Sequence, residues 1–180
     1  MFNVTYTGLD EAVAALSQSP NGLVKAVKSA VRRTLRGAKK DAGTKIKQRY
    51  TIAAGEVTKT IKLHQSGFGG SMTSSGSRNP LKKFNIRPRS RPRRMPPGGV
   101  FAQNVRGQGG QIYHAFLQRS GGVFERVGRS RFPIRQLKGP SAPGMLSNPV
   151  VGPWLEAKMA QRLGINLEHE LAAAMGGLFG

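Results

Sequence analysis

Apolar residues recur at steps of three and four near the N-terminal end of the chain, which predicts a long amphipathic helix. The helix begins at a cap formed by Ser19 and Pro20 and continues to about Tyr50, with Gly37 and Gly43 as sites for a bend. Basic residues fall largely on the side opposite the apolar stripe, so we expect the stripe to face the core. The stripe consists of Leu23, Val27, Ala30, Val31, Thr34, Ala38, Ala42 and Ile46.

The same spacing predicts a second amphipathic helix at the C-terminal end, with a kink at Gly164. We expect its stripe to pack against the first helix or a sheet, since tertiary packing of the apolar face provides most helical stability. Ahead of the first helix, the pattern predicts a short strand or an extended arm over 2–7 and a short helix from Asp10 to about Ser17. The C-terminal stripe consists of Leu155, Met159, Leu163, Leu167, Leu171 and Met175.

Between the two helices, apolar and polar residues alternate, which predicts about four short antiparallel strands. The expected fold class is therefore α+β: a small antiparallel sheet packed by the N-terminal and C-terminal helices, in a single domain over 1–180. The expected elements are a helical turn at 55–60, a strand from Ile61 with a Gly/Ser-rich connection to about 77, a hairpin over 100–118 with its turn at 107–110, strands within 123–128 and 132–139, and a helical turn at 145–148.

Residues 77–99 are expected to form a long extended arm, or a loop at the edge of the sheet, that is basic and rich in arginine and proline. The prolines Pro88, Pro92, Pro96 and Pro97 exclude a helix and hold the backbone extended. We expect little contact between this arm and the core. Its arginines are Arg87, Arg89, Arg91, Arg93 and Arg94.

The charge of the chain is large and unevenly distributed. There are 29 Lys and Arg residues against 8 Asp and Glu, which gives a formal net charge of +21. No acid lies between Glu56 and Glu125, whereas the segment from residue 150 onward is nearly balanced. Such an excess predicts a negatively charged partner.

We expect that partner to bind the arm and the basic face of the first helix, because each arginine guanidinium can bind two phosphate oxygens in a bidentate contact. Contact would be with backbone phosphates, without sequence preference, or with an acidic protein surface, and the sequence leaves both open. For the helix, the alternative is that its basic face is exposed to solvent and binds no partner. Stacking on bases is not expected, since few aromatic residues lie among these arginines and Phe84 is the nearest to them. The candidate contacts are Arg87, Arg89, Arg91, Arg93 and Arg94 on the arm and Lys28, Arg32, Arg36 and Lys39 on the helix.

Residues for catalysis or metal binding are scarce. The chain has no cysteine, and His64, His114 and His169 lack metal-ligand spacing. The run GQGGQ at 107–111 lacks the Lys-Ser/Thr of a phosphate loop, so it predicts a hairpin turn. We expect no enzymatic activity, no cofactor and no metal. Nor do we expect a signal peptide or a membrane-spanning segment.

Several segments resemble the phage minor tail protein Z family, which comprises tail-completion proteins of long-tailed phages and prophages. They are NPLKKF with the basic arm, PPGGV, VRGQGGQIYHAFL, GVFERVG, PIRQLKGPSAP and a closing LEHEL helix. These segments occur in order from about residue 20 to 175, and the run from Pro133 to Pro143 is the most specific of them.

The resemblance implies a structural virion protein at the head-proximal end of a tail, which acts in tail completion and head–tail joining. It implies a ring of copies, for which we favour a hexamer over a trimer, next to the tail terminator, tail tube and connector. The expected location is the neck of the virion, and the host cytoplasm during assembly, with contact to the packaged DNA and no membrane. We expect contacts between subunits at Pro88, Pro92, Gly139, Pro140 and Ser141.

A second function is compatible with the charge. A free nucleic-acid-binding protein of ribosomal or nucleoid type, without sequence preference, would also be strongly basic. Ribosomal proteins of this size more often carry their basic segments at the termini than in mid-chain, so we place this alternative second.

Overall fold

The computed structural model describes residues 2–5 and 21–176. The predicted helix from Asp10 to Ser17 and the cap at Ser19 and Pro20 lie outside these residues. Long helices are combined with short antiparallel strands, which confirms the α+β class. In chain order the elements are β1 (Phe2–Thr5), α2 (Asn21–Arg49), α3 (Ala54–Thr58), β2 (Ile61–Ser66), β3 (Gly69–Ser74), β4 (Arg78–Pro80), η1 (Leu81–Lys83), β5 (Asn85–Arg87), β6 (Val100–Val105), β7 (Gln108–Ile112), β8 (Ala115–Leu117), β9 (Val123–Arg126), β10 (Ile134–Gln136), β11 (Lys138–Ser141), α4 (Ala142–Leu146) and α5 (Gly152–Gly176).

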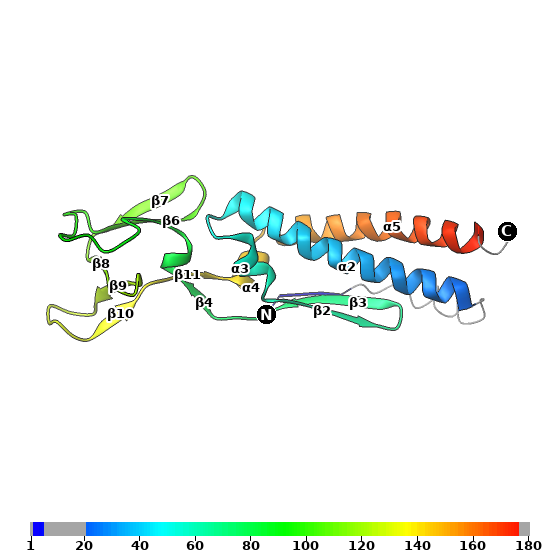
Figure 1. Cartoon of the computed structure of the whole chain (residues 1–180), viewed down its shortest axis with the longest axis horizontal. Helices are drawn as coiled ribbons and strands as arrows, with labels where there is room; N and C mark the ends of the chain where they lie inside the picture. Colours follow the sequence, from blue (N-terminus) through cyan, green and yellow to red (C-terminus); the bar gives the residue numbers. More distant parts are fainter. Residues whose placement is uncertain (1, 6–20, 177–180) are drawn as a thin grey trace.

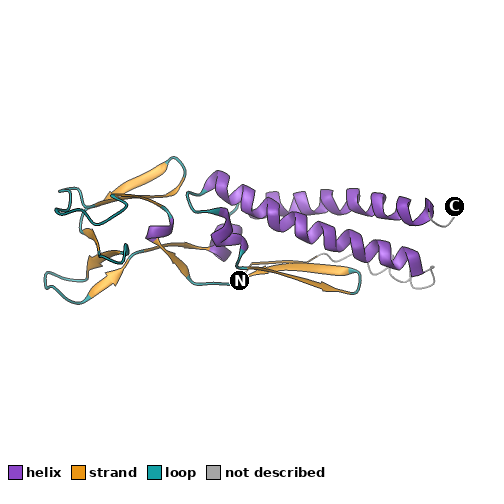
Figure 2. Ribbon diagram, in the orientation of Figure 1, coloured by secondary structure: helices purple, strands orange, loops and turns teal. Residues whose placement is uncertain are grey.

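The molecule is elongated and has two lobes (Figure 1). We call the part that contains α2, α5 and the hairpin β2–β3 the helical lobe (β1, 21–74 and 142–176). The other part contains β5 to β10, and we call it the β lobe (85–136). Figure 2 shows long helices at one end, short strands with long loops at the other, and β4 and β11 between them.

The helical lobe forms around the predicted stripe of α2. Ala38, Ala42 and Ile46 are fully buried, and Leu155 and Met159 of α5 belong to the same cluster. The buried hydroxyl of Thr34 accepts a hydrogen bond of 2.9 Å from Asn166 Nδ2, so the one polar member of the stripe is satisfied. Along the rest of α5, Leu163, Leu167 and Leu171 are half-buried.

The glycines of the two long helices do not interrupt them. At Gly37, a Cβ would lie 3.1 Å from the Arg162 side chain, and at Gly43 it would lie 2.7 Å from Thr58 Cγ2. Both positions are therefore sites where another element approaches α2 closely. Helix α5 continues through Gly164, where the expected kink would have interrupted it.

The strands form four small antiparallel sheets instead of one sheet of about four strands. The Gly/Ser-rich connection expected after β2 is itself a strand, β3, which pairs with β1 and β2. The prediction was wrong because it took a polar, glycine-rich segment for a connection. The segment is a packed strand, in which Met72 and Ser74 are buried and Gly70 lies directly against Leu35 of α2. The sheet orders are β1-β3-β2, β10-β9-β8, β11-β4 and β5-β6-β7.

The predicted hairpin over 100–118 is shorter than expected. Its turn lies at Arg106 and Gly107, and the glycines that follow belong to β7. At Gly109 a Cβ would lie 2.5 Å from the Phe101 ring, so the glycine provides room for that ring across the hairpin. The chain then leaves this sheet, and β8 pairs with β9 in another.

The first half of the predicted arm is part of the core, which corrects the expectation of little core contact. Residues 78–87 form β4, η1 and β5. Phe84 is buried in the large cluster of the helical lobe, whereas Leu81 and Ile86 are buried in a second cluster in the β lobe. This segment joins the two cores. The continuous stretch of the predicted arm with neither helix nor strand is 88–99.

Candidate anion-binding surface

The positive charge of the β lobe comes from arginine and not from lysine. Between residues 85 and 136 the sequence contains eleven arginines, no lysine and a single acid, Glu125. Guanidinium groups bind phosphate and carboxylate oxygens in a planar, bidentate geometry that an ammonium group cannot match. This composition, together with two hollows lined by these arginines, makes the β lobe the best candidate for an anion-binding surface.

The first hollow lies where the two lobes meet, and we call it the joint groove. It encloses about 910 Å³, and the described residues that line it include no acid. The Thr51 hydroxyl donates to the backbone carbonyl of Gln103 and accepts from Asn85 N at 3.1 Å. These hydrogen bonds join the helical lobe to the β lobe in the wall of the groove. The cationic lining consists of Lys47, Lys82, Lys83, Arg87, Arg89 and Arg106.

Two of those basic residues are held by contacts within the chain. Arg106 Nε donates a 2.8 Å hydrogen bond to the Lys47 carbonyl at the end of α2. Lys83 forms an ion pair with Glu56, which also pairs with Lys59. Hydrogen bonds from Lys59 and Lys83 hold the pKa of the Glu56 carboxyl below its ordinary value. Arg87 and Arg89 are exposed and line the same groove.

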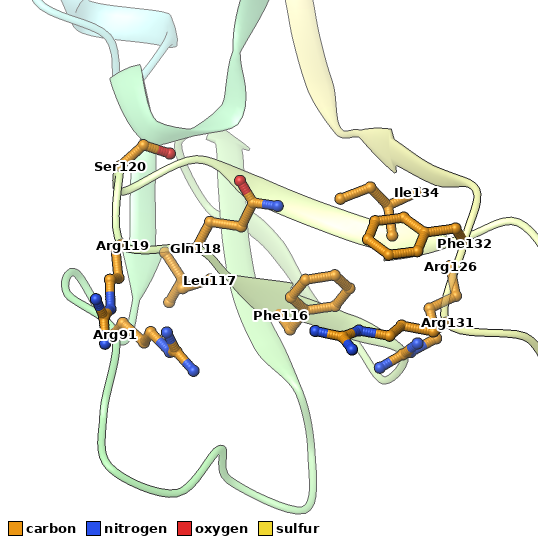
Figure 3. Close-up of a pocket in the computed structure, with 10 residues that line it drawn as sticks. All are labelled: Arg91, Phe116, Leu117, Gln118, Arg119, Ser120, Arg126, Arg131, Phe132 and Ile134. Atoms are coloured by element: carbon orange, nitrogen blue, oxygen red, sulfur yellow. The ribbon is translucent and has the colours of Figure 1, made fainter.

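The second hollow, which we call the Arg–Phe hollow, lies on the outer face of the sheet β10-β9-β8 (Figure 3). Alternate residues of a strand point to opposite faces of a sheet. Leu117 pairs with Val123, and both are buried toward the core of the lobe. Phe116 is one residue from Leu117, and Arg126 is three residues from Val123, so both face outward.

The Arg–Phe hollow encloses about 510 Å³ and combines aromatic rings with guanidinium groups. In Figure 3, Arg91 and Arg119 lie on one side, Arg126 and Arg131 on the other, with Phe116 between them. The Arg126 guanidinium lies 5.8 Å from the Phe116 ring centre, a cation–π distance. The complete lining is Arg91, Phe116, Leu117, Gln118, Arg119, Ser120, Arg126, Arg131, Phe132 and Ile134.

The one acid of the β lobe is directed away from this hollow. Glu125 precedes Arg126 on β9 and so lies on the inner face of the sheet. Its carboxylate accepts a 2.7 Å hydrogen bond from Nε of Arg135, the residue opposite it on β10. The four arginines of the hollow therefore have no carboxylate among the described residues that line it.

The structure divides the predicted arm arginines between the two hollows. Arg87 and Arg89 line the joint groove, and Arg91 lines the Arg–Phe hollow. Arg93 and Arg94 are exposed but belong to the lining of neither. Between these arginines Pro88 and Pro92 are half-buried.

The predicted helix residues lie elsewhere. The first half of α2, which carries Lys28 and Arg32, is at the end of the molecule away from the β lobe (Figure 1), and Arg36 lies near the middle of the helix. These three side chains are exposed, while Lys39 is half-buried and donates a 2.9 Å hydrogen bond to the Ile61 carbonyl. The structure does not bring this face together with the arm.

The predicted subunit contacts in the PIRQLKGPSAP run have roles within the chain. A Cβ at Gly139 would lie 2.6 Å from the Phe84 ring, so the glycine allows that ring to pack. The Pro140 carbonyl accepts a 3.0 Å hydrogen bond from Asn79 Nδ2, and the Ser141 hydroxyl caps α4. Packing alone accounts for these residue types.

Sequence reasoning missed the residues that complete the Arg–Phe hollow, namely Arg119, Arg126, Arg131 and the rings of Phe116 and Phe132. The alternation within β9 could have shown that Arg126 points away from the core, because Val123 and Glu125 share the other face. The presence of eleven arginines without lysine was a second available signal.

Residues 2–5 and 21–176 contain neither of two other kinds of site. Within that part of the chain, no group of three or more His, Asp or Glu side chains is placed to hold a metal ion. No helix there has the length and apolar character to cross a membrane. Comparisons of the chain with family models, curated proteins and solved structures found no match.

Proposed function

We propose that the protein is a structural subunit of a phage tail, which acts at the head-proximal end in tail completion and head–tail joining. The resemblance of its segments to the minor tail protein Z family supports this role. The observation that carries the proposal is that eleven arginines and one acid are concentrated in the β lobe, at one end of the molecule. In a ring of copies, that lobe would form one continuous cationic surface.

The shape of the subunit supports the same role. The helical lobe balances part of its charge internally, for example through the 2.6 Å ion pair between Arg33 and Glu170. That lobe is suited to packing against other proteins, and the β lobe to contact with the packaged DNA or an acidic neighbouring ring. Contact with DNA through phosphates carries no sequence information, as a passage for any genome requires.

The test replaces Arg89, Arg91, Arg93 and Arg94 with glutamine and uses the variant as the sole copy during phage assembly. All four side chains are exposed, so the fold should persist, as a circular dichroism spectrum would verify. We expect heads and tails to accumulate unjoined, or joined particles to lose their DNA, with infectivity falling at least tenfold. The matched control replaces Lys25, Lys40, Lys62 and Lys158 of the helical lobe and should retain infectivity. Equal infectivity of the two variants would refute a role for the arm's charge.

A free nucleic-acid-binding protein is the second candidate, because two cationic hollows on a single chain could bind duplex without any ring. It predicts tight duplex binding by the isolated chain, with affinity that falls steeply as salt rises. Mass spectrometry of purified virions separates the two functions. The chain should be present in a small multiple per particle if it is a tail subunit, and absence from virions would leave only the free binder.

A further inference from the structure

We propose that the Arg–Phe hollow binds an unpaired segment of single-stranded nucleic acid, with a base stacked on Phe132 and phosphates on the surrounding arginines. This site is more specific than the general cationic surface. It does not depend on the proposed role in tail assembly, because it follows from the chemistry of one hollow in one chain.

Phe132 is the first observation behind this inference. Its side chain is 64% exposed, although phenylalanine is among the residue types most often buried. It follows Arg131, whose guanidinium lies 5.7 Å from the ring centre. The core of the lobe does not require this ring, so an exposed flat apolar surface beside a cation is available to a ligand.

The second observation is the distribution of charge around the two rings. Arginines stand on opposite sides of Phe116 in Figure 3, with Arg91 and Arg119 on one side and Arg126 and Arg131 on the other. A single strand that crosses the hollow would present phosphates to both pairs while a base lies over a ring. Proteins that bind single strands combine these two features, a cationic path for the backbone and aromatic platforms for bases.

Size and geometry favour a single strand over a duplex. A hollow of about 510 Å³ is in the range that accommodates one small ligand, such as a single base with its sugar. In a duplex the faces of the bases are covered by their neighbours, so only an unpaired base can stack on a side chain. A duplex would contact the arginines and leave the rings unused.

An acidic peptide is a less suitable occupant. Its carboxylates could bind the guanidinium groups, but they offer no flat surface to cover Phe132. A nucleic-acid base has a π-face of matching shape, and stacking on an aromatic ring does not depend on which base it is. An acidic peptide is therefore treated as an outcome of the test.

The first experiment measures binding of the full chain to a fluorescent 15-nucleotide oligothymidylate and to a 15-base-pair duplex by anisotropy. Phe132→Ala should weaken single-strand binding on the order of tenfold, and duplex binding less than twofold, because only the single strand stacks. Phe132→Trp should restore the affinity. Tyr113→Ala is the matched control, since Tyr113 is 69% exposed but does not line the hollow. It should leave both affinities unchanged.

The second experiment addresses the arginines through the salt dependence of single-strand binding. Arg131→Gln should reduce the slope of log affinity against log salt by about 0.7, the value for one phosphate contact on a single strand. Arg129→Gln is the control, since Arg129 lies in the same loop but does not line the hollow. It should change the slope by less than half as much.

Three results would overturn the proposal. The first is an equal loss of single-strand and duplex affinity in Phe132→Ala. The second is a glutamate-rich peptide that binds as tightly as the oligonucleotide and depends equally on Phe132. The third is no detectable binding of oligothymidylate at about 50 mM salt. None of these would decide whether the chain occurs in virions, so the failure of this site and of the tail role are distinguishable.

Discussion

In the helical lobe, α2 and α5 bury one continuous cluster that also takes in Phe84, Met72 and α4. In the β lobe, the buried cluster has six residues, which come from η1, β5, β6, β8 and β9. The helical lobe pairs acids with basic residues across its helices, as in the bidentate contact between Arg162 and Asp41. The β lobe has one acid for eleven arginines. The same chain thus has one end suited to packing and another that keeps charge exposed at the expense of core.

This contrast explains why the two lobes need different connections to the rest of the molecule. A cluster of six residues contributes little hydrophobic stabilisation, and small cores are generally marginal. The segment from Leu81 to Ile86 places side chains in both clusters, so the large core supports the small one. A lobe that is held in this way can expose its basic residues without acidic neighbours.

The largest expected effect tests the core of the helical lobe. Leu155 is fully buried between α5 and the α2 stripe. Leu155→Ala should lower the free energy of unfolding by about 2–5 kcal/mol, measured by denaturant titration. Ile165→Ala is the matched control, because Ile165 lies on the same helix and is 59% exposed. A loss below about 1 kcal/mol for Leu155→Ala would show that the two helices are not one core.

The next experiment tests whether the β lobe opens separately. Leu117 is buried in the small cluster, and Leu117→Ala should destabilise that lobe by about 2–5 kcal/mol. Because the clusters are distinct, native-state hydrogen exchange should speed up in β6 to β10 and stay unchanged in α2 and α5. Equal acceleration in both lobes would mean that they unfold as one unit.

A smaller effect tests the close approach at Gly43. Alanine favours a helix by about 1 kcal/mol over glycine, but a Cβ at Gly43 would lie 2.7 Å from Thr58 Cγ2. Gly43→Ala should therefore destabilise the protein by about 1 kcal/mol, and Thr58→Ser should relieve the loss. At Gly164, where no atom lies within 4 Å of such a Cβ, alanine should stabilise by up to about 1 kcal/mol. Stabilisation at both sites would contradict the packing role of Gly43.

The smallest effect concerns the ion pairs of Glu56 near the junction of the lobes. Its pKa is lowered in the folded protein, so it contributes stability above its ordinary pKa of 4.5 that is lost as pH falls through the lowered value. Glu56→Gln should cost less than about 1 kcal/mol at pH 7, because the pairs are partly exposed. Thermal unfolding of both proteins between pH 7 and 3 should show this difference vanish in acid. A constant difference would exclude the ion pairs as its cause.

Spacing and composition along the chain are enough to predict the two long helices, the face each one buries and the α+β class. A period of 3.6 over many residues identifies both the element and its buried side, as Ala38, Ala42 and Leu155 illustrate. The lack of acids between Glu56 and Glu125 is likewise a property of the sequence alone. These properties depend on local spacing and composition, which a linear chain displays directly.

How the strands divide into sheets, and which residues line each hollow, depend on long-range packing. Alternation indicates which way a side chain points but not which strands become neighbours, so β8 leaves the sheet of β7 without a local signal. Likewise Gly43 is a site of close packing only because the fold places Thr58 against it. Arg91, Arg126 and Arg131 share one hollow because two loops and strand β9 converge there, and that convergence is a long-range property.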